Sequence, residues 1–83
     1  MADKLTRWQI EVLRCAYTAF DSKLTRGSSA VWYRAPMAIR ALVHKRLLEL
    51  RKRGTEARLT AEGRELVEAN PKRFGITIAR SQP

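Results

Sequence analysis

Apolar and polar positions divide the chain into three stretches with the spacing of amphipathic helices, over residues 6–20, 36–45 and 60–70. Thr6 and Gln9 match a capping box at the start of the first helix, in which each side chain satisfies a backbone N–H. The apolar face of this helix is broad, which favours a central helix with contacts on two sides. Its aromatic residues are expected in the core: Trp8, Tyr17 and Phe20.

Residues 48–59, between the second and third helices, have the pattern of a β-hairpin with its turn at Arg53-Gly54. This turn pairs apolar with apolar residues on one face, Leu48 with Leu59 and Leu50 with Ala57, and acid with base on the other, Glu49 with Arg58 and Arg51 with Glu56. A slip of one residue would send every side chain to the wrong face. The sequence therefore predicts this single register.

The remaining segments have weaker patterns. Residues 21–29 are polar and predict a loop, while residues 30–34 are rich in β-formers and predict a short strand. Adjacent side chains of a strand point to opposite faces, so one of Trp32 and Tyr33 is expected to be exposed. Gly63 costs a helix about 1 kcal/mol relative to Ala, which indicates close packing at that position.

The length of 83 residues and the hydrophobic content of 45% predict one small α+β domain over residues 6–70, followed by a tail over residues 71–83. The tail alternates Phe74, Ile76 and Ile78, which fits either an edge strand or a partner-binding segment. No apolar run is long enough for a membrane span, and the single Cys15 cannot form an internal disulfide. A cytoplasmic protein without membrane contact is expected.

Seventeen Lys and Arg against eight Asp and Glu give a net charge of +9, which favours a polyanionic partner such as nucleic acid. The candidate chemistry for an enzyme is sparse. The chain has one His and one Cys, no pair of carboxylates at catalytic spacing and no phosphate-binding glycine loop. We therefore expect a protein without catalytic activity, cofactor or metal.

The order of helix, hairpin and helix, with LVHKRLLEL leading to ARLTAEGRELV, resembles the winged helix-turn-helix regulators of the multiple-antibiotic-resistance (MarR) and phenolic-acid (PadR) types over residues 39–67. The matching residues are Leu42, Leu47, Leu48, Leu59, Thr60, Glu62, Gly63, Arg64 and Leu66. The resemblance implies a winged-helix domain of three helices and a two-stranded hairpin wing. Arg46 stands where the family has Gly, so a positive φ there would cost roughly 1 kcal/mol.

In the resembled regulators the recognition helix enters the major groove and the wing contacts the flanking backbone. The resemblance therefore implies a small transcriptional regulator that binds double-stranded DNA, and its compact size would also suit a phage or mobile-element protein. The residues that it places near bases are Arg34, Met37, Arg40 and His44. The residues that it places near phosphates are Arg51, Lys52, Arg53 and Arg58.

Protein docking is the alternative function, because winged helices also serve as interaction modules in larger complexes. The surface for a homodimer or a protein partner would then combine the first helix with Trp32, Tyr33, Phe74, Ile76 and Ile78. Contact with RNA or the ribosome is a third possible function, which the net positive charge would also suit.

Overall fold

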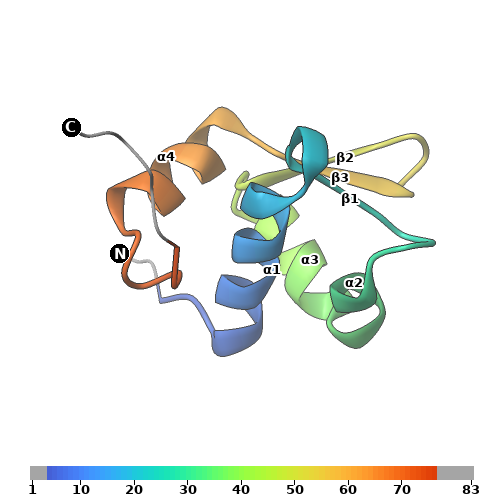
Figure 1. The fold of residues 1–83 in the computed structure, drawn as a ribbon. Helices are drawn as coiled ribbons and strands as arrows, with labels where there is room; N and C mark the ends of the chain where they lie inside the picture. The colour runs from blue at the N-terminus through green and yellow to red at the C-terminus, as the bar shows by residue number, and fades with distance from the viewer. Residues whose placement is uncertain (1–3, 77–83) are drawn as a thin grey trace.

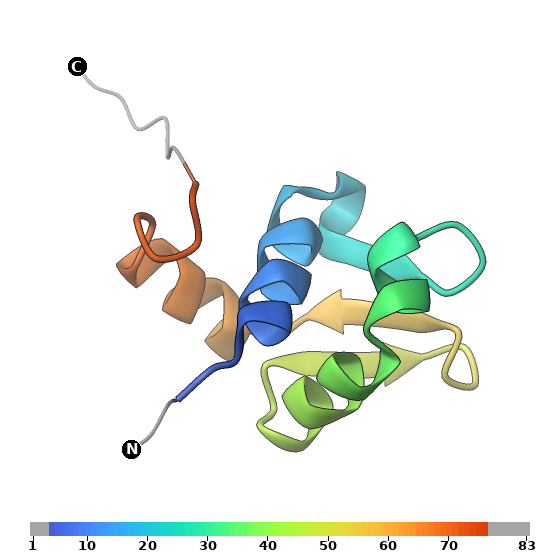
Figure 2. The ribbon, with the colours of Figure 1, turned by 90° about the horizontal axis from the view of Figure 1, so that it is seen from below.

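The computed structural model of the protein describes residues 4–76 and forms a small α+β domain of two layers (Figure 1). In chain order the elements are α1 (Arg7–Thr18), a 3-10 turn (Phe20–Ser22), β1 (Lys23–Thr25), α2 (Ala30–Arg34), α3 (Pro36–His44), β2 (Leu48–Arg51), β3 (Glu56–Leu59) and α4 (Ala61–Ala69). The three strands form an antiparallel sheet in the order β1-β3-β2. Helices α1, α2 and α3 lie on one face of this sheet, as the view from below shows (Figure 2).

The hairpin has the register that its side-chain pattern predicts. Leu48 pairs with Leu59 and Leu50 with Ala57, and on the other face Glu49 lies opposite Arg58 and Arg51 opposite Glu56. The ion pairs on that face run along each strand, from Arg51 to Glu49 and from Arg58 to Glu56. Leu48 and Ala57 are buried in the core. The loop of residues 52–55 projects beyond the strands, and three of its residues, Lys52, Arg53 and Gly54, have positive φ.

A third strand, β1, corrects the prediction of a loop over residues 21–29. It pairs with β3 so that Leu24 lies opposite Ala57, and the Arg26 N–H beyond it donates to the Thr55 carbonyl at 2.8 Å. A strand of three residues with one buried side chain is too short to show alternation in the sequence. The sheet therefore has three strands rather than the two expected.

Residues 30–34 form helix α2, so the prediction of a strand there is wrong. Val31 and Trp32 are both buried and pack with Ala35 against the core. Neighbouring side chains on a strand would face opposite ways, whereas on a helix both can reach one core. Tyr33 is still exposed, as expected for one of the aromatic pair, with 86% of its surface open. Residues 4–76 thus contain four α-helices, one more than predicted.

The core joins α1, α3, the sheet and α4. Its fully buried large side chains are Val12, Leu13, Ile39, Leu42, Leu48, Val67 and Phe74. Phe74 is 1% exposed, in a series of turns closed by the bond from the Ile76 N–H to the Pro71 carbonyl. It therefore belongs to the core and not to an exposed edge strand or partner surface. Ile76 packs partly against the core, and Ile78 lies outside the described residues.

Two aromatic residues of α1 lie nearer the surface than predicted. Trp8 is 44% exposed, because it sits on the first turn of the helix, beyond the fully buried Val12 and Leu13. Tyr17 is half-buried, and its hydroxyl donates to Glu68 of α4 at 3.0 Å. The side chain of Phe20 is outside the described part of the structure.

The helix ends form largely as the sequence predicts. Thr6 and Gln9 make the full capping box, and Thr60 accepts from the Gly63 N–H at 2.9 Å. Arg46 has a φ of 63°, in the left-handed region that glycine favours. The Thr60 hydroxyl donates to the Arg46 carbonyl at 2.8 Å, so the start of α4 holds the reversal between α3 and β2.

Gly63 makes the close approach that its place in a helix predicted. A Cβ at this position would overlap the backbone carbonyl of Leu47 and lie 2.9 Å from Cδ1 of Leu59. The carbonyl is part of the chain reversal before β2 and cannot move aside as a flexible side chain could. A methyl group here would push α4 away from the sheet.

We expect Gly63→Ala to lower the free energy of unfolding by about 1–3 kcal/mol, because overpacking outweighs the better helix propensity of alanine. The matched control is Gly27→Ala, since a Cβ at Gly27 meets no atom within 4 Å. That change should leave stability unchanged or raise it by up to about 1 kcal/mol. Urea unfolding followed by circular dichroism measures both. Equal stability of the Gly63 variant and the native protein would contradict the packing argument.

Candidate nucleic-acid interface

Helix α3 presents a polar outer face opposite its buried face. Pro36 starts the helix at a position that needs no hydrogen-bond donor, and Ile39 and Leu42 anchor the inner side. Met37, Arg40 and His44 are exposed on the outer side, as the helical pattern predicts. The outer face is therefore available to a partner along the whole length of the helix.

A groove separates this helix from the hairpin. Its volume is about 570 Å³, and its lining comes from the turn after β1, α2, α3 and the hairpin: Arg26, Trp32, Tyr33, Pro36, Ile39, Arg40, Leu50 and Gly54. No carboxylate is among these residues. Arg40 and the hairpin tip thus border the same groove, so an anionic ligand could contact both.

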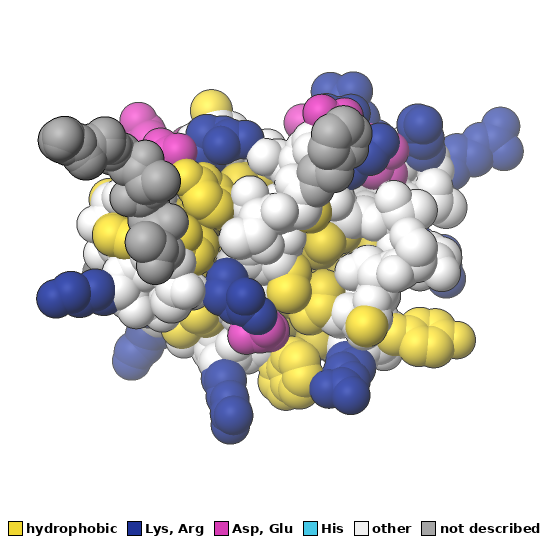
Figure 3. All heavy atoms as spheres, viewed as in Figure 1, with side chains coloured by type: hydrophobic (Ala, Val, Ile, Leu, Met, Phe, Trp, Pro, Cys, Tyr) yellow, Lys and Arg dark blue, Asp and Glu magenta, His cyan; other side chains and the backbone are white. Residues whose placement is uncertain are grey.

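Three cations around this groove have no acidic partner. Arg26, Arg40 and Arg53 are exposed, and none of them forms an ion pair within residues 4–76. Lys and Arg side chains also project beyond the hairpin end of the molecule in the space-filling view (Figure 3). No sequence pattern indicates a role for Arg26, since only the pairing of β1 with β3 brings its turn beside the hairpin tip.

The open face of the sheet holds a second set of charges. Side chains alternate along a strand, so Arg51 and Arg58 lie on the face opposite the buried Leu48 and Ala57. Arg51 lies 3.6 Å from a carboxylate oxygen of Glu49. Two of the cations assigned to phosphate contact therefore point away from the groove that Arg40 borders.

Glu56 is the centre of this second set and is only 4% exposed. Arg58 donates to its carboxylate at 2.9 Å, and the ammonium groups of Lys23 and Lys52 lie 3.7 Å from it. The hydrogen bond from Arg58 lowers the pKa of Glu56 below its usual value, with further lowering by the charges of Lys23 and Lys52. One carboxylate thus holds three cations, and the cluster keeps a net positive charge.

Arg34 lies on the other side of α2 from the hairpin. It lines a shallow groove with Trp8 of α1 and Met37 of α3, and neither Arg40 nor any hairpin residue lines this groove. Trp8 and Met37 are both exposed there. The structure therefore does not bring Arg34 together with the hairpin cations.

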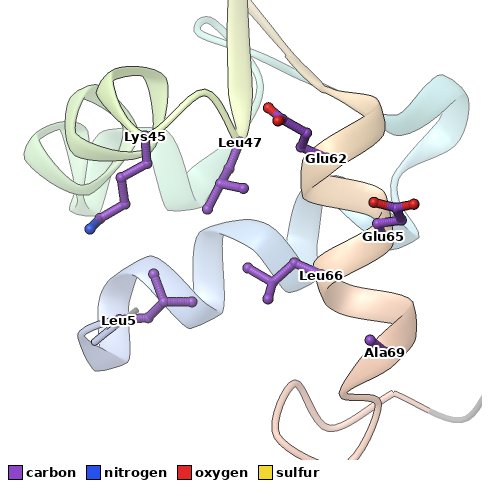
Figure 4. Close-up of a pocket in the computed structure, with 7 residues that line it drawn as sticks. All are labelled: Leu5, Lys45, Leu47, Glu62, Glu65, Leu66 and Ala69. Atoms are coloured by element: carbon purple, nitrogen blue, oxygen red, sulfur yellow. The ribbon is translucent and has the colours of Figure 1, made fainter. Parts of the chain in front are cut away.

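A third groove lies between α4 and the start of α1. Figure 4 shows the side chains of Leu5, Leu47 and Leu66 pointing into it. Lys45 stands on one wall, and the carboxylates of Glu62 and Glu65 come from α4 on the other. The two carboxylates would repel phosphate, so this groove is a poor site for nucleic acid.

Residues 4–76 contain no group of three His, Cys, Asp or Glu side chains that could hold a metal ion. None of the helices in this part of the chain is long and apolar enough to cross a membrane. The arrangement of cations around α3 and the hairpin is the strongest functional feature of the described surface.

The lowered pKa of Glu56 predicts acid sensitivity of the sheet. A carboxyl whose pKa is lower in the folded state stabilises the fold above its unfolded pKa, near 4.5, and this contribution is lost as the pH falls through the folded pKa. We expect Glu56→Gln to be less stable than the native protein at pH 7 and to lose less stability on acidification. Urea unfolding between pH 7 and pH 3 measures this.

The control for this experiment is Glu65→Gln, which removes the same charge from an exposed site on α4. It should retain most of the acid sensitivity of the native protein. If Glu56→Gln and Glu65→Gln lose stability equally on acidification, the cluster of three cations does not stabilise the sheet.

Comparison with protein-family models, with curated proteins and with solved structures finds no match for the chain.

Proposed function

We propose that this protein is a small, non-catalytic winged-helix protein that binds double-stranded DNA, most simply as a cytoplasmic transcriptional regulator. The order of elements supports this proposal, because the β2–β3 hairpin directly follows α3, as a wing follows a recognition helix. Helix α2 directly precedes α3, with only Ala35 between them, which is shorter than the usual helix-turn-helix connection of about three to four residues.

The observation that carries the proposal is the groove bordered by Arg40, Arg26 and the hairpin tip, whose lining contains cations and no carboxylate. The outer face of α3 is narrow enough to enter a major groove, which is about 12 Å wide. Arg40 is its longest donor, and a guanidinium can bind guanine O6 and N7 with two hydrogen bonds. Arg40 would then read sequence, flanked by Met37 and His44.

The hairpin tip supplies the contacts that do not depend on sequence. Lys52 and Arg53 sit on a thin projecting loop, and Arg26 lies beside it. Such cations are suited to phosphates, which set affinity and orientation rather than specificity. With about three phosphate contacts, the logarithm of the association constant should fall with the logarithm of salt concentration with a slope of about −3.

Protein docking is the second candidate function, and the exposed pair of Trp8 and Met37 favours it. These side chains are 44% and 72% exposed on the face that also carries Arg34. Exposed apolar patches with a polar rim are typical of protein contacts. Met37 also flanks Arg40 on the outer face of α3, so a protein docked here would compete with DNA for the start of that helix.

Substitutions on α3 and on the hairpin should have different effects on binding. We expect Arg40→Ala to reduce discrimination between specific and random duplex by about 1–3 kcal/mol. The double variant Lys52→Ala and Arg53→Ala should weaken binding to all duplexes alike and make the salt slope shallower. Fluorescence anisotropy at two salt concentrations measures both, with a specific duplex selected from a random pool.

The matched control is the double variant Lys4→Ala and Lys72→Ala, which removes the same charge from exposed sites that line neither α3 nor the hairpin. It should bind every duplex more tightly than the hairpin variant does. Equal losses for the two double variants would show that only net charge matters. Equal losses on specific and random duplex for Arg40→Ala would exclude a role in reading bases.

A further inference from the structure

An aromatic side chain, Tyr33, stands at the rim of the groove beside the hairpin. A regular duplex would make little use of this ring. Tyr33 is 86% exposed on the last turn of α2, while its neighbour Trp32 is buried. Leu50 of the hairpin is also exposed and lines the same groove. The two side chains offer apolar surface that a ligand in the groove could cover.

The size of the groove suits one nucleotide. Its volume of about 570 Å³ falls in the range of small-molecule sites, about 300–1,000 Å³. Pro36 and Leu50 provide exposed apolar surface. A nucleobase could pack against this surface. The lining contains no carboxylate that would repel the phosphates of the same nucleotide.

Two cations of the lining complete the pattern. Arg26 lies in the turn after β1 and Arg40 on α3, and both lack an acidic partner within residues 4–76. Proteins recognise single-stranded nucleic acid with two elements. Cations lie along the phosphate backbone, and aromatic rings stack on the bases. Groups of both kinds line this one groove.

We propose that the groove binds an unstacked nucleobase, with the Tyr33 ring against the base and with Arg26 on the neighbouring phosphate. The preferred ligand is then DNA that contains an unpaired nucleotide. This inference rests on the proposed function and adds the class of DNA substrate. In a fully paired duplex the faces of the bases are covered by their neighbours, so Tyr33 has no base to stack on.

The test compares three short labelled DNAs by fluorescence anisotropy: a fully paired duplex, the same duplex with one unpaired thymine, and the same bulge with an abasic nucleotide. The native protein should bind the thymine bulge about 5- to 100-fold more tightly than the paired duplex, as expected for one stacked base. The abasic bulge keeps the flexibility of the DNA but lacks the base, so its affinity should be near that of the paired duplex.

Variants at Tyr33 test the stacking contact itself. Tyr33→Ala should abolish the preference for the thymine bulge, whereas Tyr33→Phe should retain it because the ring remains. Tyr33 is too exposed for either change to disturb the core. Trp8→Ala is the control, since it removes an exposed ring that does not line this groove, and it should keep the preference.

The outcomes separate this inference from the proposed function. Equal affinity for the paired duplex and the thymine bulge, or for the thymine and abasic bulges, would overturn the inference and leave duplex binding intact. A bulge preference that survives Tyr33→Ala would also overturn it. Failure to bind any of the three DNAs would overturn the proposed function as well, and would favour an apolar protein partner in the groove.

Discussion

The register of the β2–β3 hairpin determines where the candidate functional side chains of the sheet lie. Burial of Leu48 and Ala57 fixes the pairing, because a slip of one residue would expose both. The same register sends Arg51 and Arg58 to the open face of the sheet, where Glu49 and Glu56 neutralise part of their charge. The tip remains free to project beside α3. Within the described residues the hairpin cations thus divide into a set that pairs with carboxylates, Arg51, Lys52 and Arg58, and Arg53, which does not.

Several residues other than glycine take part in the chain reversals around the sheet, at a cost in backbone strain. Arg46, Lys52 and Arg53 all have positive φ, which costs a non-glycine residue roughly 1 kcal/mol or more. At Arg46 the hydroxyl of Thr60 holds the reversal through the carbonyl. At the hairpin tip two positions that glycine would occupy with less strain carry cations instead. This placement fits a functional role for their charge.

The sequence predicts the parts of the fold that depend on local patterns, and it fails where tertiary contacts decide. The hairpin register, both helix caps and the close packing of Gly63 follow from spacing and from the chemistry of single residues. Strand β1 could not be predicted, because three residues form a strand only through their pairing with β3. In α2 the burial of Val31 and Trp32 together overrides their β-propensity.

The candidate site could be predicted from the sequence only in part. Arg40 and the hairpin tip border one groove, as expected. Arg34 lines a different groove, and Arg26 reaches the site only through the pairing of β1 with β3.

The central claim is that the outer face of α3, the hairpin tip and the turn at Arg26 bind one nucleic acid together. The most direct measurement is a titration of duplex DNA into ¹⁵N-labelled protein, followed by two-dimensional NMR. The account predicts shifts of the backbone amides over residues 26–28, 37–44 and 52–55, with little change along α4. Shifts confined to α4 and the groove of Leu5, Leu47 and Leu66, or no shifts at any DNA concentration, would contradict it.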